Sequence, residues 1–373
     1  MRMSEEIEEK TERLVHLCAK EALGGVLINS QPNFAWLTAG GRNGVDSSRE
    51  NGVATLFVRR DGKRFVLANR IEMNRIVLEE LNGEDYEPLE FGWEEEKANP
   101  AIINKLANSV LTEQLPLGCD IPIGDAKVVE SAIAGARFKL TPNEVDRFKT
   151  FGQDAGKAIG ELAHSLEPGL MEREVARRTK DALAAIGADA IVTLVAADDR
   201  LRRFRHPLPK DVQWKKLLMI VVCARRHGLT ASLTRIVCAG SIPDDLRMRT
   251  RTAAQVNAEL FAATRPGVTG RELYEVAANS YRAEGFPDEE KLHHQGGAAG
   301  YRTRDWVAHP KSTDRVQANQ AFAWNPSITG TKVEETMIAF EDHIEVITTT
   351  SDWPSIPIEV QERAYVFPDV LSL

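Results

Sequence analysis

Apolar positions in the first third of the chain alternate between helical and extended spacing. Residues 5–23 are apolar at helical intervals, which predicts an amphipathic helix, and the short apolar run at 26–28 predicts a buried strand. Two strand-like runs over 53–68 flank Asp61-Gly62, a dipeptide typical of a β-hairpin turn. A second helix is predicted over 71–81, before Asn82-Gly83. This part of the chain therefore reads as α/β.

A second block begins with a strong helix-start signal. Thr141 can cap a helix whose first position is Pro142, and apolar residues then recur at helical spacing as far as Leu162. We place the domain boundary just before this signal. The expected domains are 1–138 and 139–373.

The second block contains an internal repeat. Pro168-Gly169 and Pro266-Gly267 each follow a helical pattern and lie 98 positions apart. A second helical pattern follows each pair and stops at a glycine, Gly187 or Gly285, at the same offset. The alternative is a coincidence of two Pro-Gly turns. We expect two helix–turn–helix–strand halves related by pseudo-symmetry around a mostly antiparallel sheet.

Composition narrows the function classes. The 373 residues are 43% hydrophobic and 27% charged, with a formal charge of −8, which is ordinary for a globular protein and argues against a nucleic-acid platform. Basic residues crowd positions 202–216, and we interpret this stretch as a solvated loop. The N-terminus has no signal-like apolar core, and no apolar run is long enough to cross a membrane. The four cysteines lack metal-ligand spacing, so we expect a cytoplasmic protein.

Four segments stand in order along some 300 residues: NFAWLTAG at 33–40, the hairpin 218–240 with Gly228 and Thr234-Arg235, HQGGAAG at 294–300, and GTKVEET at 330–336 followed by Glu341-Asp342. Together they resemble the creatinase–prolidase–aminopeptidase P (pita-bread) family. The resemblance implies an α+β protein. Its C-terminal domain would have the pseudo-two-fold pita-bread fold, a curved, mostly antiparallel sheet with covering helices. A smaller α/β creatinase-like domain would precede it.

The peptidases of this family hold two metal ions with two aspartates, a histidine and two glutamates. Hard divalent cations prefer such anionic oxygens. The resemblance places the five ligand positions, in chain order, on Val221, Ser232, Gly297, Asn325 and Glu334. One carboxylate cannot hold a pair of metal ions. The resemblance therefore implies a degenerate metal site and no metal cofactor.

Creatinase is the family's precedent for hydrolysis without a metal. The resemblance places its acid–base histidine on His206, a second pocket histidine on His309, and a carboxylate that orients the histidine on Glu334. Imidazole titrates near neutrality, so it can move a proton between water and a leaving nitrogen. The arginine that would grip a substrate carboxylate falls near Arg42, in competition with Arg49, Arg302 and Arg304.

The same residues also have structural interpretations. His206 could be an exposed loop histidine, His309 could pack beside Pro310, and Glu334 could face solvent from a strand. His293 and His294 look like a ligand pair, but neighbours in a strand point to opposite faces, so we do not expect both at one site.

Four further residues complete the candidate site. Cys223 and Ser232 lack a specific relay of histidine and acid, so we interpret them as core or pocket wall. Trp324 and Tyr301 are assigned to the substrate pocket, either lining it or plugging it.

Two functions remain open. The first is a metal-independent hydrolase that acts on a C–N bond of a small carboxylate-bearing compound through His206 and Glu334. The second is a catalytically inactive pseudo-peptidase that binds peptides or proteins. An intact pocket in which His206 and Glu334 face one another favours the first, toward which we lean. A pocket plugged by Trp324 or Tyr301, with basic loops outside, favours the second. The resemblance also implies a homodimer.

Overall fold

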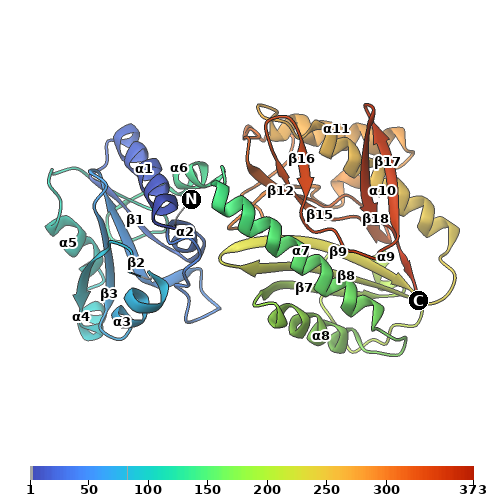
Figure 1. Cartoon of the computed structure of the whole chain (residues 1–373), viewed down its shortest axis with the longest axis horizontal. Coiled ribbons are helices and arrows are strands. Elements are labelled where there is room, and N and C mark those ends of the chain that lie inside the picture. The colour runs from blue at the N-terminus through green and yellow to red at the C-terminus, as the bar shows by residue number, and fades with distance from the viewer. Residues whose placement is uncertain (1–2, 82) are drawn as a thin grey trace. The chain divides into compact units, whose positions relative to one another are not determined.

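The computed structural model describes residues 3–81 and 83–373, which divide into two compact units, Met1–Asn143 and Glu144–Leu373 (Figure 1). The division lies five residues after the boundary expected from the sequence, just inside helix α7 (Pro142–His164), which begins at the predicted proline. In the described part of the chain, no helix is both long and apolar enough to span a membrane.

The first unit is a mixed six-stranded sheet in the order β4-β3-β2-β1-β5-β6. The predicted hairpin is present, because β2 pairs antiparallel with β3 and Gly62 supplies the positive φ of the turn. The predicted helix over 71–81 forms as an α-turn and a π-turn, and Asn82 lies outside the described residues. The elements are α1 (Met3–Glu21), β1 (Gly25–Ser30), α2 (Gln31–Leu37), β2 (Asn51–Arg59), β3 (Arg64–Asn69), α3 (Met73–Arg75), η1 (Ile76–Glu80), β4 (Glu87–Phe91), α4 (Trp93–Ala98), α5 (Ile102–Ser109), β5 (Leu117–Cys119), β6 (Lys127–Val128) and α6 (Glu130–Arg137).

The second unit opens with α7 and is built on two larger sheets, β19-β9-β8-β7 and β11-β10-β12-β15-β16, with helices packed against them (Figure 1). Its remaining elements are α8 (Glu172–Ala185), β7 (Asp189–Ala197), α9 (Arg200–Arg203), β8 (Leu217–Arg226), β9 (Leu229–Cys238), α10 (Asp244–Ala263), α11 (Gly270–Ala283), η2 (Glu289–Lys291), β10 (Gly296–Ala299), β11 (Trp306–Val307), β12 (Gln320–Trp324), β13 (Ser327–Ile328), β14 (Thr331–Lys332), β15 (Glu335–Ala339), β16 (Ile344–Val346), β17 (Ser355–Val360), β18 (Arg363–Pro368) and β19 (Leu371–Ser372).

The internal repeat is confirmed element by element. Helices α8 and α11 start 98 positions apart, end 98 positions apart, and have the same length of 14 residues. Gly169 and Gly267 both have positive φ, and their amides donate to the carbonyls of Trp214 and Val316 in matching loops. The two halves therefore use the same local turn, in agreement with the predicted pseudo-two-fold architecture.

Strand β9 joins the two sheets of the second unit. The Thr234 amide donates to the carbonyl of Glu334, and the Ser232 amide donates to the side-chain hydroxyl of Thr336 in β15. The sheet therefore continues as one curved, mostly antiparallel surface, as the fold prediction required. Residues on β8 and β9 that share one face, among them Cys223, Ser232 and Thr234, are carried toward the segment around Glu334.

Helix α7 packs closely against the segment 347–350. Gly152, Gly156 and Gly160 recur once per turn, and a Cβ atom at any of them would collide with the segment 347–350. At Gly156 the colliding atoms are the backbone carbonyls of Thr348 and Thr349. Glycine is therefore required by close approach here rather than by a turn.

Candidate functional site

Lys332 and Glu334 form a buried ion pair where β14 ends and β15 begins. They are two positions apart, so an extended backbone points both side chains to one face. The Lys332 Nζ atom lies 2.8 Å from Glu334 Oε2, which also accepts a hydrogen bond from the Thr234 hydroxyl at 2.7 Å. Both charged side chains are over 90% buried. The remaining oxygen of Glu334, Oε1, faces a second cation.

That cation is Arg304, from the loop between β10 and β11. Its Nη2 atom donates to Glu334 Oε1 at 3.2 Å and to Asn325 Oδ1 at 3.1 Å, and its Nη1 atom donates to Ser232 Oγ at 3.4 Å and to the Thr303 carbonyl at 2.6 Å. The Nε atom is buried and has no hydrogen-bond partner among the described residues. The guanidinium thus contacts three of the five residues that the resemblance assigns to metal-ligand positions, and it retains one unused donor.

The two cations determine the charge of Glu334. Burial alone would raise its pKa, but Lys332 and Arg304 lower the pKa to about 2, so the side chain is a carboxylate at neutral pH. A carboxylate so strongly stabilised is a weak base. Two cations against one anion leave the cluster with one net positive charge, which favours an anionic ligand.

Three histidines border this cluster. His206 follows α9, whereas His293 and His294 follow η2, and one ring nitrogen from each of the three lies within 4.8 Å of the other two. His293 Nε2 is 3.0 Å from His206 Nε2, and His293 Nδ1 is 3.2 Å from Asn325 Nδ2. The histidines and the ion cluster are therefore connected through Asn325.

All three imidazoles are neutral at physiological pH. Burial, followed by repulsion from Lys332, lowers the pKa of His293 to about 2. Burial and Arg304 lower the pKa of His294 to about 4. Burial and Lys332 also lower the pKa of His206, against an opposing effect of Glu334.

The family's pair of metal ions does not fit these residues. Val221 stands on the site face of β8 within an apolar cluster and offers no donor. At Gly297 a Cβ atom would fall on the backbone carbonyl of Trp306, so no histidine can be placed there without moving β11. Arg304 and Lys332 already neutralise Glu334, the one carboxylate of the set. The three histidines are spaced closely enough for one metal ion, but the same two cations repel a metal as they repel a proton.

The structure brings together part of the set named from the sequence. His206 and Glu334 belong to one cluster, since the charge of Glu334 acts on His206. His309 is exposed, and its Nδ1 accepts a hydrogen bond from the Lys311 amide instead. Cys223 is buried and accepts a hydrogen bond from the Ser232 hydroxyl, and burial and then Glu334 raise the pKa of its thiol.

The assigned pocket residues Trp324 and Tyr301 are buried side chains. Trp324 lies in the core, where its Nε1 donates to Thr264 at the end of α10; neighbouring Asn325 faces the cluster. The Tyr301 hydroxyl donates to Glu144 in α7. The assignment of both residues to the substrate pocket stays a prediction. Arg42 lies on the first unit with an exposed side chain.

Two features of the site were missed in the sequence. His293 and His294 do serve one site, because they lie in a loop rather than a strand and their rings stack at 4.5 Å between centroids. Arg304 appeared only as a competitor of Arg42. Its distinguishing signal is its position in the loop after the glycine-rich segment, which brings it toward Glu334.

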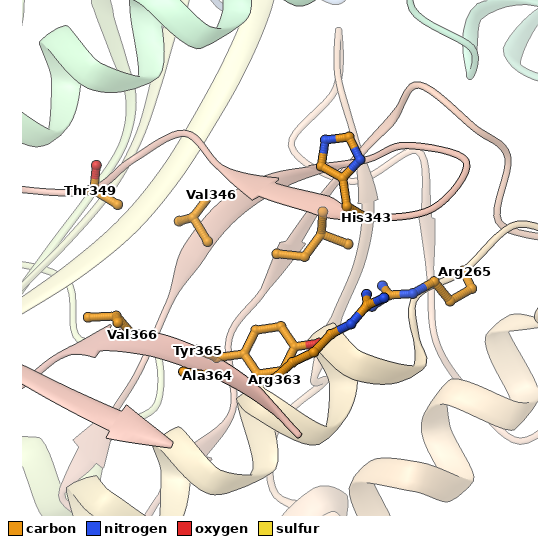
Figure 2. A pocket seen from close by; sticks show the side chains of 9 residues that line it. Arg265, His343, Val346, Thr349, Arg363, Ala364, Tyr365 and Val366 are labelled. Carbon is orange, nitrogen blue, oxygen red and sulfur yellow. The ribbon is translucent and has the colours of Figure 1, made fainter. Parts of the chain in front are cut away.

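A cavity of about 530 Å³ lies elsewhere in the second unit (Figure 2). Residues of β16 and β18 and the Arg265 side chain line it: Arg265, His343, Ile344, Val346, Thr349, Arg363, Ala364, Tyr365 and Val366. None of the residues named for the site is among them. The cavity is therefore separate from the polar cluster.

Comparison with known proteins agrees with this architecture. Residues 146–348 match the model of metallopeptidase family M24. A Xaa-Pro dipeptidase of Pyrococcus horikoshii is 22% identical over 363 residues, covering 92% of this chain and 98% of the relative. The crystal structure of the prolidase from the same organism superposes with a TM-score of 0.75 at 18% identity, over 92% and 99% of the two chains.

A second solved structure is similar in fold. The N-terminal domain of the FACT complex subunit SPT16 from chickpea superposes with a TM-score of 0.71 at 10% identity, over 93% of this chain and 96% of that domain. The family match covers more than half of the chain and includes each residue of the polar cluster. This chain therefore belongs to metallopeptidase family M24.

Proposed function

We propose that this protein binds a small carboxylate-bearing compound in the cluster of Arg304, Lys332 and the neighbouring histidines, without a metal ion. One observation carries the proposal. The Arg304 guanidinium contacts Ser232, Asn325 and Glu334, three positions that hold ligands in metal-dependent relatives, and its buried Nε has no acceptor among the described residues. The covalently attached guanidinium of Arg304 thus supplies the positive charge that a bound metal ion would supply.

The physical argument concerns unused donors in a buried, positive site. A buried N–H without a partner costs free energy, and a ligand oxygen would remove that cost. A carboxylate oxygen is a strong, charged acceptor for the one N–H that Arg304 has left, at Nε. The net positive charge favours the same class of ligand.

The test is binding of N-acetylproline and of its uncharged amide in buffer with EDTA. We expect the acid to raise the melting temperature and the amide not to. Arg304→Gln should weaken binding of the acid by about 10- to 100-fold, since a hydrogen bond to a charged group contributes about 1.5–3 kcal/mol. Arg282→Gln, which removes an exposed arginine of α11, is the matched control. Equal binding of acid and amide would reject carboxylate recognition.

A second candidate function is hydrolysis of a C–N bond in such a compound. It is supported by His206, a neutral and exposed imidazole close enough to Glu334 to be affected by its charge. Release of amine from small amides and amidines would be measured for the wild type, His206→Ala and His309→Ala. Hydrolysis through His206 requires loss of turnover with retained binding in His206→Ala alone. Equal loss of binding and turnover would assign His206 to recognition.

A further inference from the structure

The orientation of the Asn325 amide is fixed by two neighbours. Arg304 Nη2 can only donate, so the atom 3.1 Å from it must be the amide oxygen of Asn325. The Nδ2 atom then lies 3.2 Å from the His294 carbonyl, which can only accept. Rotating the amide by 180° would place a donor against a donor and an acceptor against an acceptor. The network therefore assigns the amide without ambiguity.

The amide fixes the proton position on His293. Asn325 Nδ2 lies 3.2 Å from His293 Nδ1, so Nδ1 must be the unprotonated nitrogen that accepts. A neutral imidazole carries one N–H, which for His293 is then at Nε2. His293 is 8% exposed and held neutral by its surroundings, so it has no second proton.

The same logic extends to His206. His293 Nε2 donates across 3.0 Å to His206 Nε2, which must be unprotonated to accept. The proton of neutral His206 is therefore on Nδ1. Protonating His206 at Nε2 would set two N–H groups against each other, so the hydrogen bonds from Asn325 through His293 oppose a charged His206.

We propose that Asn325 is a positioning residue that, through His293, holds His206 as the Nδ1–H tautomer, so that the ring nitrogen of His206 that does not contact His293 is a hydrogen-bond donor. Selection of a hydrogen-bond acceptor, a carboxylate, rests on the proposed function; the tautomer does not. The resemblance assigns Asn325 to a metal-ligand position. In this protein its amide determines which nitrogen donates in each hydrogen bond from Asn325 to His206.

One substitution should reverse the direction of the hydrogen bonds that run from position 325 through His293 to His206. In Asn325→Asp the carboxylate accepts from both sides, so His293 would move its proton to Nδ1 and accept at Nε2. His206 would then carry its proton on Nε2. Asn325→Ala removes the side-chain amide that donates to His293 and should leave a mixture of tautomers. This variant also tests the inference if Asn325→Asp fails to fold because its carboxylate faces the His294 carbonyl.

The experiment is NMR of the full chain with 15N-labelled histidine rings, which distinguishes protonated from unprotonated ring nitrogens. His206→Gln and His293→Gln assign the signals, and Asn279→Asp, an exposed position on α11, controls for added charge. We expect the Nδ1–H form of His206 in the wild type and in Asn279→Asp, the Nε2–H form in Asn325→Asp, and both forms in Asn325→Ala. An Nε2–H wild type, or a tautomer indifferent to position 325, overturns the inference.

Titration with N-acetylproline separates this inference from the proposed function. We expect the acid, and not its amide, to shift the His206 Nδ1–H signal, and Asn325→Asp to weaken binding about tenfold. A correct tautomer without any ligand shift rejects carboxylate recognition and keeps the positioning role of Asn325. Binding of the acid with the opposite tautomer does the reverse.

Discussion

Glu334 and Glu335 are adjacent residues that occupy different environments. Glu334 faces Lys332 and Arg304 in the polar cluster. Glu335 points to the other face, where its Oε1 lies 2.9 Å from Arg235 Nη1 and its Oε2 accepts from the Thr348 hydroxyl. Burial raises the pKa of Glu335, so its charge depends on Arg235. Alternation along an extended backbone thus separates the carboxylate of the polar cluster from the carboxylate that pairs with Arg235.

Removing the partner of Glu335 should be costly. Arg235→Met leaves a buried carboxylate without its cation, and we expect the free energy of unfolding in urea to fall by about 3–5 kcal/mol. The double variant Arg235→Met/Glu335→Met should be markedly more stable than Arg235→Met alone, because no uncompensated charge remains. A double variant as unstable as the single one would show that packing, rather than charge, sets the cost.

Stability should depend on pH through His293. Its pKa is about 2 in the folded state against about 6.5 when unfolded, so below pH 6.5 the unfolded state binds more protons. Stability is then lost as the pH falls from about 6.5, at about 1.4 kcal/mol per pH unit from His293. Lys332, His206 and His294 oppose protonation and Glu334 favours it.

Urea unfolding between pH 7 and pH 4.5 measures this contribution. In His293→Gln the free energy of unfolding should depend less steeply on pH than in the wild type, by the contribution of about one proton. His164→Gln, at the exposed end of α7, should retain the wild-type slope. The prediction is contradicted if both variants follow the wild type.

Metal content is the direct test of the expected metal-free site. Protein purified from medium supplemented with Mn, Co and Zn should contain no stoichiometric metal pair, because Val221 and Gly297 offer no donor and two cations surround Glu334. Elemental analysis gives the ratio of metal to protein. Two equivalents per chain would contradict both the metal-free site and the proposed function.

At the scale of elements, α6 and α7 offer a matched comparison of two helical glycines. Gly156→Ala pushes a methyl group into the carbonyls of Thr348 and Thr349 and should destabilise the second unit by about 1–3 kcal/mol. Gly135, in α6, has open space around its Cβ position, so Gly135→Ala should stabilise the first unit by about 0.5–1 kcal/mol. Calorimetry of both variants checks the opposite signs. The same sign for both would reject close packing as the reason for the α7 glycines.

At the scale of the whole molecule, each described contact of the polar cluster comes from the second unit, whereas the sequence assigned the substrate carboxylate to Arg42 in the first. We therefore expect Arg42→Gln to retain the N-acetylproline affinity that Arg304→Gln loses. Isothermal titration of the two variants side by side decides between them. If only Arg42→Gln lost affinity for N-acetylproline, the carboxylate would be assigned to Arg42 in the first unit.

The sequence predicted the architecture better than the site, for physical reasons. A Pro-Gly turn and a helix-ending glycine are local demands on the backbone, so the repeat at an offset of 98 was visible in the residues themselves. Arg304 and Arg302 look alike in sequence, and only the path of the loop after β10 selects Arg304. His293 and His294 were separated on the assumption of a strand, and their loop conformation lets both rings face His206.

Gly297 limits what could be engineered into this site. Carboxylates introduced at positions 232 and 325 would face Arg304, and salt bridges would compete with any metal ion. A histidine introduced at position 297 would first need β11 to move away from β10. Building a metal centre here therefore requires removal of the two cations and a shift of a strand in addition to the new ligands.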